Sequence, residues 1–219
     1  MSRIHAVMAS VEEIARHFDA EPSDALAPPY EVVEGNPNQI VIENQGRRLL
    51  RPATWGFPRL TREMREQGDP PGRIGLVADL TNPMWDQLVV EPRYRCLIPL
   101  THFANPDGPA GERTRTWFSI QGQPILCWAG FCRNTPEFGP VYAGMTMDAN
   151  AAVMPTNDRM PVLLEPDEVD RWLHGSITDV IQFQFRTPPP ASRMEVLPTQ
   201  DRWRSGKLPP MPGPQLDLL

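Results

Sequence analysis

Lysine is nearly missing from this sequence: Lys207 is the single lysine, and the other basic residues are all arginines. Acidic residues outnumber basic ones, which gives a formal net charge of −6. Proteins that bind nucleic acid broadly through its phosphates need a strongly basic face. The composition therefore argues against broad, non-specific nucleic-acid binding, although it leaves room for a local basic cleft.

Cysteine is also scarce. The three that occur, Cys96, Cys127 and Cys132, are odd in number, have apolar flanks and form no C-x-x-C pair. We interpret them as buried thiols rather than a disulfide framework. No apolar run approaches the length of a membrane span, and the N-terminal residues lack the apolar stretch of a signal peptide. We therefore expect a cytoplasmic protein with no membrane partner.

The common motifs for phosphate, metal and nucleophile chemistry are missing as well. The sequence has no G-x-x-x-x-G-K-[ST] or G-x-G-x-x-G loop, no H-E-x-x-H pair and no G-x-S-x-G turn. Its histidines, His5, His17, His102 and His174, are scattered without metal-ligand spacing. We predict neither a metal nor a cofactor. His102 follows a buried strand, and we interpret it as a structural histidine or, alternatively, as a base.

Proline, by contrast, is abundant, with 27 residues, which disfavours long uninterrupted helices. Short apolar strands separated by a few helical segments predict one α+β domain over residues 1–200. From Thr187 onward prolines cluster, and the final part of the chain is predicted to lie extended on the surface or to be disordered. We assign residues 201–219 to a Pro-rich C-terminal tail.

Several elements have clear local signals. Ser10 and Glu13 form the pattern of a capping box, which predicts a helix start. Residues 39–43 and 48–51 flank a turn that contains Gly46, which predicts a hairpin. The other expected elements are a second hairpin from 116–120 and 124–130, strands at 1–9, 76–82, 95–99 and 141–147, helices at 166–172 and 176–185, and a solvated excursion at 61–72.

The turn Asn157-Asp158-Arg159-Met160-Pro161 follows the strand predicted at 141–147 and precedes a predicted helix. One interpretation is structural, with Pro161 fixing the backbone before the helix begins. The other is a functional site, because an arginine inside a turn at the end of a core strand is unusual. The turn by itself favours the structural interpretation, and segments elsewhere in the chain change that balance.

These segments occur in a definite order and together span most of residues 1–200. They are residues 9–15, Tyr30, Trp55-Gly56 with Pro58, residues 95–99, Phe103, Ala129-Gly130, Met145-Thr146 with Ala149-Asn150, and residues 158–161. In order and spacing they resemble the SOS response-associated peptidase (SRAP) family.

The resemblance implies a single α+β domain built on a β-barrel-like sheet, with a cleft for single-stranded DNA. In that family, a cysteine exposed by methionine removal attacks the ring-opened sugar of an abasic site. Its amine and thiol close a stable thiazolidine, with help from an Asn, a Glu and a His. The resemblance further implies single-stranded or abasic DNA as the partner, with DNA contacts at Trp55, Gly56, Pro58 and Arg159.

The sequence departs from the family at each reacting position. Ser2 stands at the nucleophile, Val77 at the Asn, Asn105 at the Glu and Asn157 at the His, and Asp79 replaces a DNA-facing Arg. A serine hydroxyl is hardly ionised near neutral pH, and an asparagine cannot exchange protons there. The motifs of the scaffold are kept, whereas the groups expected to react are replaced.

Three hypotheses for function follow. The first, which we favour, is a catalytically degenerate member that binds single-stranded DNA or a protein partner without crosslinking. The second is an enzyme that forms a Schiff base between the amine of Ser2 and abasic DNA, with His5 or His102 as base. The third is an interaction protein with no DNA role, which the acidic balance favours. A peptidase would need an activated nucleophile, and the sequence offers none.

Overall fold

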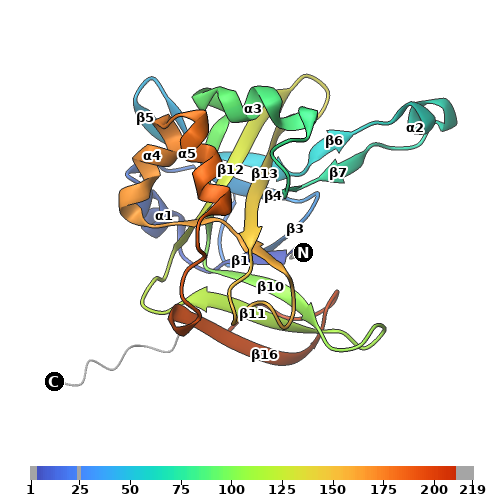
Figure 1. Cartoon of the computed structure of the whole chain (residues 1–219), viewed down its shortest axis with the longest axis vertical. Helices are drawn as coiled ribbons and strands as arrows, with labels where there is room; N and C mark the ends of the chain where they lie inside the picture. The colour runs from blue at the N-terminus through green and yellow to red at the C-terminus, as the bar shows by residue number, and fades with distance from the viewer. Residues whose placement is uncertain (1–3, 24–25, 211–219) are drawn as a thin grey trace.

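A sheet that closes on itself forms the centre of the computed structural model, which describes residues 4–23 and 26–210 (Figure 1). The strands of the ring are β4 (Pro37–Asn44), β5 (Arg47–Trp55), β9 (Arg95–Leu100), β12 (Leu126–Thr135) and β13 (Gly139–Asp148). They pair antiparallel in the order β13-β12-β9-β4-β5. Parallel pairing of Val141 with Thr54 and of Tyr142 with Trp55 joins the two ends. The predicted barrel-like core and α+β class are therefore confirmed.

The ring is filled by apolar and aromatic side chains. Every residue of β9 is buried, and the strand lies between β12 and β4 in the ring. The ring of Trp55 stacks on Tyr142 with 6.3 Å between centroids and meets Trp128 edge-on at 5.8 Å. Burial of each such ring stabilises the fold by a few kcal/mol. Cys96 and Cys127 are buried and Cys132 is half-buried, and all three are free thiols.

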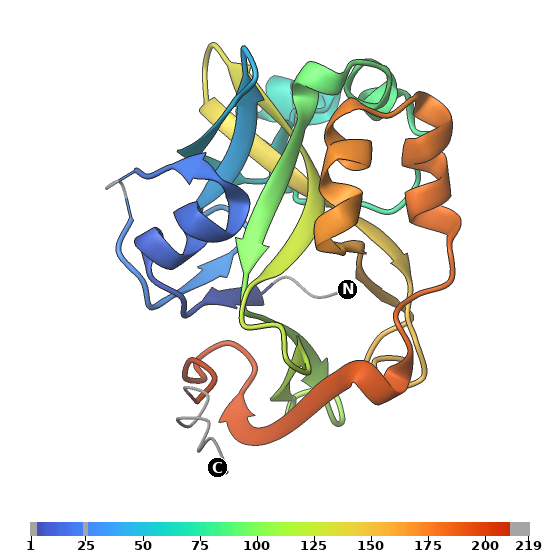
Figure 2. The ribbon, with the colours of Figure 1, turned by 90° about the vertical axis from the view of Figure 1, so that its left-hand side faces the viewer.

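A second sheet packs below the ring and carries the N-terminal strand in its interior (Figure 2). Its order is β16-β11-β10-β1-β3. The strands are β1 (Ile4–Val7), β3 (Tyr30–Val33), β10 (His102–Asp107), β11 (Thr114–Ile120) and β16 (Met194–Arg202). β1 pairs with β3 on one side and with β10 on the other, and all four of its residues are buried.

Short strands extend the ring or leave it. β2 (Ala20–Glu21), β8 (Leu76–Val77), β14 (Arg159–Pro161) and β15 (Leu163–Leu164) add to the ring. β6 (Phe57–Arg59) and β7 (Gly72–Ile74) pair only with each other and carry α2 (Arg62–Gln67) at their tip. This arm projects from the body in Figure 1, and α2 has no buried residue. The solvated excursion predicted for residues 61–72 is therefore confirmed, with a helix inside it.

Helices cover the ring on its other sides. α1 (Val11–Phe18) begins with the predicted capping box of Ser10 and Glu13. α3 (Asp86–Val90), α4 (Val169–His174) and α5 (Ile177–Phe185) lie together at one end of the ring (Figure 1). Short 3-10 turns occur at Pro83–Trp85, Pro92–Tyr94, Pro166–Glu168 and Ala191–Arg193. The helices predicted at 166–172 and 176–185 are thus present. None of the helices in the described ranges is long and apolar enough to cross a membrane.

Arg95 ties these helices to the ring. Its guanidinium is buried and donates to the carbonyl oxygens of Trp172 at 2.9 Å, Gly175 at 2.6 Å and Val89 at 3.4 Å. Carbonyls at the C-terminal ends of helices have no partner within the helix and carry partial negative charge, so a cation satisfies them well. Burial lowers the pKa of Arg95, but an arginine stays protonated at any ordinary pH.

The predicted hairpin of residues 116–120 and 124–130 is wrong. β11 pairs with β10 and β16, whereas β12 pairs with β9, β13 and β15, so the two strands belong to different sheets. Gly122, with a φ of 73°, makes the expected turn, and one isolated bridge joins Ile120 to Gln123. The ladder stops there because Pro124 has no N–H to donate, and the chain crosses to the ring.

The chain after Thr187 includes a sheet strand, which the sequence did not predict. β16 pairs with β11 from Met194 to Arg202 and is mostly exposed. Pro198 is tolerated there because β16 is an edge strand. Trp203 follows, and its backbone N–H donates to the carbonyl of Arg113 at 2.9 Å. The division at residue 200 stays a prediction, and residues 211–219 lie outside the described part of the chain.

Candidate functional site

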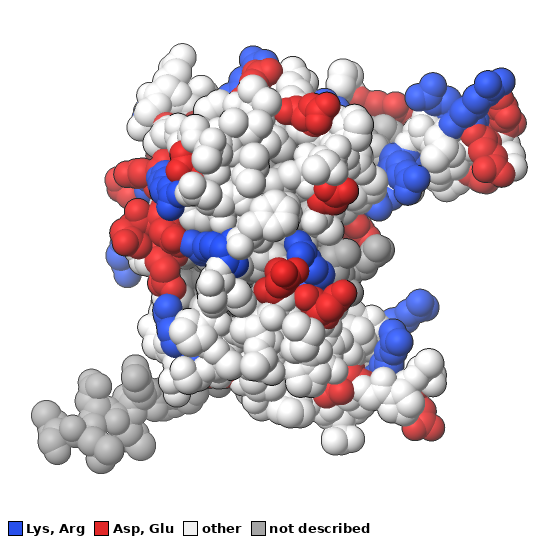
Figure 3. All heavy atoms as spheres, viewed as in Figure 1, with Lys and Arg blue, Asp and Glu red and all other residues white. Residues whose placement is uncertain are grey.

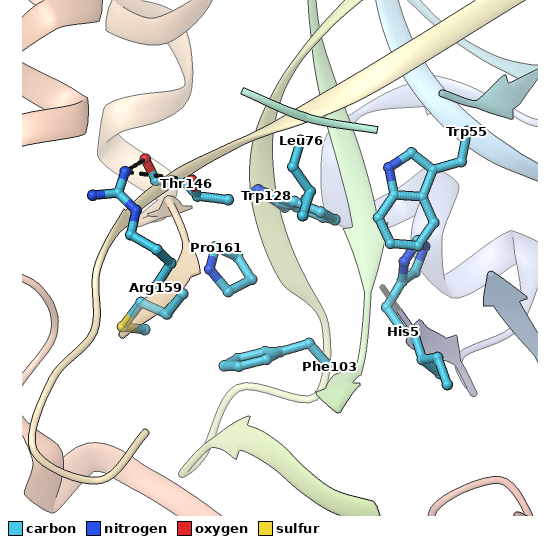
Figure 4. A pocket seen from close by; sticks show the side chains of 10 residues that line it. His5, Trp55, Leu76, Phe103, Trp128, Thr146, Arg159 and Pro161 are labelled. Atoms are coloured by element: carbon cyan, nitrogen blue, oxygen red, sulfur yellow. Dashed lines mark hydrogen bonds between the residues drawn. The ribbon is translucent and has the colours of Figure 1, made fainter. Parts of the chain in front are cut away.

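A small apolar hollow opens where the N-terminal strand meets the ring (Figure 4). Its volume is about 10 Å³, which is near the limit for a single water molecule. The lining comes from both sheets and comprises Ile4, His5, Trp55, Leu76, Phe103, Trp128, Thr146, Arg159, Met160 and Pro161. A nucleobase cannot enter a space of this size, so any larger ligand has to lie at its edge.

His5 is the buried polar side chain of this hollow, and it is held neutral. Asn38 Oδ1 accepts from the Tyr30 hydroxyl at 2.9 Å and from the Gln39 backbone N–H at 2.8 Å. Asn38 Nδ2 therefore donates to His5 Nε2 at 3.1 Å, which assigns the proton of the imidazole to Nδ1. Burial lowers the pKa of His5 to about 3. His5 is thus a poor proton acceptor near neutral pH.

The two tryptophans of the hollow are fixed by hydrogen bonds to backbone carbonyls. Trp55 Nε1 donates to Gly75 O and Trp128 Nε1 donates to Met145 O, each at 2.7 Å. Trp55 is 1% exposed, so it offers no face on which a base could stack in this conformation. The resemblance to the SRAP family implied DNA contacts at Trp55, Gly56 and Pro58, and this assignment stays a prediction. In the structure Gly56 adopts a φ of 112° and Pro58 is half-buried on the β6–β7 arm.

Arg159 lies at the opposite side of the hollow from His5 and points toward β13 (Figure 4). Its guanidinium donates to Thr146 O and to Asp148 Oδ1, both at 2.6 Å, and to Ala78 O at 3.5 Å. The Asp148 carboxylate is 85% exposed, so it places a negative charge beside Arg159 at the surface. The guanidinium of Arg159 is consequently occupied by hydrogen bonds within the protein, and the Asp148 carboxylate largely neutralises its charge.

Asn105 and the turn that contains Asn157 are brought together. Asn105 is fully buried on β10, and its Nδ2 donates to the Thr156 hydroxyl at 3.1 Å. Thr156 in turn donates to Val153 O at 2.9 Å, and the Asn157 side chain accepts from the backbone N–H of Arg159 at 3.1 Å. Among the described residues, Asn105 Oδ1 has no hydrogen-bond partner.

An orphaned buried acceptor costs about 1–3 kcal/mol, and Asn105 Oδ1 is one of several buried polar atoms, His5 Nδ1 among them, that have no partner among the described residues. Ile4, the first described residue, pairs with Ala104, the neighbour of Asn105. The N-terminal strand therefore leads directly to this amide. Ser2 itself lies outside the described residues. Sequence reasoning missed Thr156, whose only signal is its place directly before Asn157.

The other predicted residues take structural or surface positions. Val77 is buried on β8, and its carbonyl accepts from Thr146 and Gln184. Asp79 is exposed, and hydrogen bonds from Thr81 lower its pKa, so it is a carboxylate at neutral pH. This charge sits next to Ala78, whose carbonyl Arg159 contacts.

His102 is a half-buried histidine at the start of β10 and is poorly suited to the role of base in the second hypothesis. Its Nδ1 lies 3.0 Å from the Thr101 hydroxyl, and burial lowers its pKa to about 4. In the described part of the chain, no group of three or more His, Cys, Asp or Glu side chains is arranged to hold a metal ion.

The sequence matches the model of the family described as SOS response associated peptidase (SRAP) over residues 2–203. The chain belongs to the SRAP family. No curated protein matches it in sequence. Membership of the SRAP family associates the chain with the SOS response.

Solved structures show the same fold at low identity. A Bordetella bronchiseptica protein matches with a TM-score of 0.75 and 20% identity, over 91% of this chain and 99% of that one. A Bacteroides thetaiotaomicron protein matches with a TM-score of 0.71 and 16% identity, over 90% and 91%. A phage-related protein from Bordetella bronchiseptica has a TM-score of 0.66 and 17% identity, over 90% and 93%. At these identities the likeness concerns the SRAP fold.

Proposed function

We propose that this SRAP protein binds single-stranded DNA, abasic DNA included, through non-covalent contacts and forms no stable crosslink with it. The proposal is supported by the meeting of Asn105 with the Thr156–Asn157 turn. In the family these positions hold a Glu and a His that move protons. Two amides keep a polar, hydrogen-bonding site, but neither can donate or accept a proton near neutral pH.

The remaining titratable groups of the hollow do not replace the missing pair. Among its described lining residues only His5 and Arg159 ionise. His5 is neutral with its Nε2 already occupied by Asn38, and Arg159 is always protonated and paired with Asp148. Loss of one acid or base typically lowers a rate about a hundred- to ten-thousand-fold. If the amine of Ser2 formed a Schiff base with abasic DNA, the hollow would offer no evident base for the proton transfers that follow.

Crosslinking is tested directly with an oligonucleotide that carries one abasic site. After incubation with the purified protein, we expect no adduct that survives a denaturing gel, and no imine that borohydride traps. A fluorescence-anisotropy titration of the same oligonucleotide at low salt should still report reversible binding. A heat-stable adduct would overturn the proposal, borohydride trapping would favour the Schiff-base alternative, and a lack of binding would favour an interaction protein without a DNA role.

Restoring the family's residues gives the complementary test. We expect the combination Ser2→Cys, Val77→Asn, Asn105→Glu and Asn157→His to gain a gel-stable adduct with abasic DNA. The matched control carries the last three substitutions and keeps Ser2, so it should gain none. Circular dichroism and binding to intact single-stranded DNA verify that both variants are folded. If the folded, DNA-binding quadruple variant stays unreactive, these positions are not the degenerate counterparts of the reacting set.

A further inference from the structure

The apolar hollow beside His5 offers DNA phosphates little positive charge, whereas another surface carries arginines that form no ion pair with a described residue. Arg159 is neutralised by Asp148, and Asp79 adds a carboxylate beside it. The loop between β10 and β11, together with the turn after β16, forms an open hollow of about 700 Å³. Its lining is Ala110, Gly111, Arg113, Arg202, Trp203, Arg204 and Ser205. We name this surface the β16 turn surface.

Three exposed arginines, Arg113, Arg202 and Arg204, line the β16 turn surface. None of them forms an ion pair with a residue in the described ranges. Lys207 follows close behind and is also exposed. Nearby acidic groups are fewer: Glu112 lies in the loop, and the Asp201 carboxylate accepts the backbone N–H of Lys207 at 3.0 Å. Figure 3 shows blue groups at the lower right edge of the body, with red groups below them.

The surface is held in place from below by Arg115. This buried side chain forms an ion pair with Glu31 and donates through Nε to Trp203 O at 2.9 Å and through Nη1 to Lys207 O at 3.3 Å. Trp203 packs against the small cluster that contains Ile4 and Trp117. The backbone of the turn is therefore fixed, so the exposed guanidiniums project from a rigid support.

The β16 turn surface also lies close to Asn105. Asn105 pairs with Thr116 across the sheet, and Arg113 is three residues further along β11 and its loop. At about 3.3 Å per residue this separation is roughly 10 Å, or one to two nucleotides of extended strand. The exposed arginines surround an open hollow rather than a closed anion pocket, which suits successive phosphates of one chain.

We infer that the β16 turn surface binds the phosphate backbone of single-stranded DNA where the strand leaves the Asn105 site. Arg113, Arg202 and Arg204 supply the phosphate contacts, and they replace charge that the face around Arg159 lacks. The inference rests on the proposed DNA binding and adds a second contact region to it. These contacts are independent of base sequence, because guanidiniums on phosphates read no base edges.

The salt dependence of binding tests this surface. Anisotropy of a labelled oligo(dT) is measured from 25 to 200 mM salt, and the slope of log Kobs against log salt counts the phosphate contacts at about 0.7 per contact for single strands. The combined change Arg113→Ala, Arg202→Ala and Arg204→Ala should make the slope about 2 units shallower. Lysine at the same three positions should keep most of the slope, because it preserves the charge.

The matched control removes three arginines that do not line the β16 turn surface: Arg16→Ala, Arg47→Ala and Arg51→Ala. All three are exposed and lie on α1 and β5. Because each triple variant removes three arginines, the net charge of the protein changes equally in both. We expect this control to keep the wild-type slope. An equally shallower slope in both triple variants, or an unchanged slope in the β16 turn variant, would overturn the assignment of phosphate contacts to the β16 turn surface. Either result would leave the proposed DNA binding intact. A wild-type protein that binds no oligo(dT) even at 25 mM salt would overturn both the surface and the proposed function. Urea unfolding checks that every variant is folded.

Discussion

Acid should destabilise this protein through His5, and the substitution His5→Gln isolates that effect. In the folded chain His5 is buried among Trp55 and Trp128, with ring centroids 4.8 and 5.9 Å away, and Asn38 donates to its Nε2. A glutamine keeps an acceptor for Asn38 but cannot be protonated in this pH range. Any difference in acid sensitivity between the two proteins therefore reports the imidazole.

The magnitude follows from the lowered pKa. The pKa of His5 falls from 6.5 to about 3 on folding because burial penalises the charged ring. Between pH 6.5 and pH 3, His5 is protonated in the unfolded chain but stays neutral in the folded chain. The free energy of unfolding therefore falls as the pH drops. The loss approaches about 1.4 kcal/mol per pH unit below 6.5, which gives roughly 2 kcal/mol at pH 5 and is complete only below pH 3.

Urea unfolding of both proteins at pH 7.5 and pH 5 measures this term. We expect the wild type to lose about 2 kcal/mol more than His5→Gln, with unchanged dependence on urea concentration. The other groups titrate alike in both proteins and cancel in the comparison. NMR of the imidazole protons gives a second readout, in which His5 should show no titration between pH 8 and pH 5. Equal losses in both proteins, or a His5 resonance that titrates near pH 6.5, would refute the reasoning.

Three further predictions concern packing and the site. Gly144→Ala should cost at least about 3 kcal/mol, because the new Cβ would lie 2.0 Å from Trp128, whereas Gly72→Ala, with its nearest atom at 3.8 Å, should cost less than about 1 kcal/mol in the same urea titration. Arg95→Met should lower the unfolding free energy by about 3 kcal/mol and speed hydrogen exchange in α4, because three carbonyls lose their donor; unchanged exchange would contradict the anchoring role. Asn105→Leu should lower the unfolding free energy by about 1–2 kcal/mol, because it removes the hydrogen bond from Nδ2 to Thr156 together with an acceptor that has no described partner. It should also weaken DNA binding at least threefold in anisotropy; unaltered affinity would remove Asn105 from the binding site.

Short sequence motifs predicted the helices and turns that depend only on neighbouring residues. The helix after Ser10 follows from its capping box, and the hairpin around Gly46 follows from a turn residue between two apolar runs. The barrel came from the family resemblance rather than from the periodicity, because the ring is closed by Thr54 and Val141, which are far apart in sequence. Nothing local indicates such a pairing.

Long-range packing also explains what the sequence did not predict. Gln121-Gly122 has a hairpin signal, but the neighbours of β11 and β12 come from elsewhere in the chain and outcompete local pairing. Arg95 reads as the charged start of a strand, although it is buried beneath three carbonyls. At the site, the family resemblance named Asn105 and Asn157, whose roles stay a prediction, whereas it did not name Thr156, because the contact of Thr156 with Asn105 spans 51 residues.

The interior position of β1 bears on how the chain emerges from the ribosome. β1 is buried on both sides and needs two neighbours, yet Ala6 pairs with His102 on one of them. At about 5–20 residues per second, that neighbour is synthesised some 5–20 s after β1. Throughout this interval β1 can pair only with β3, and its second edge stays open. An open apolar edge is a template for association with other chains, so we expect production of this protein to depend on chaperones that shield nascent chains.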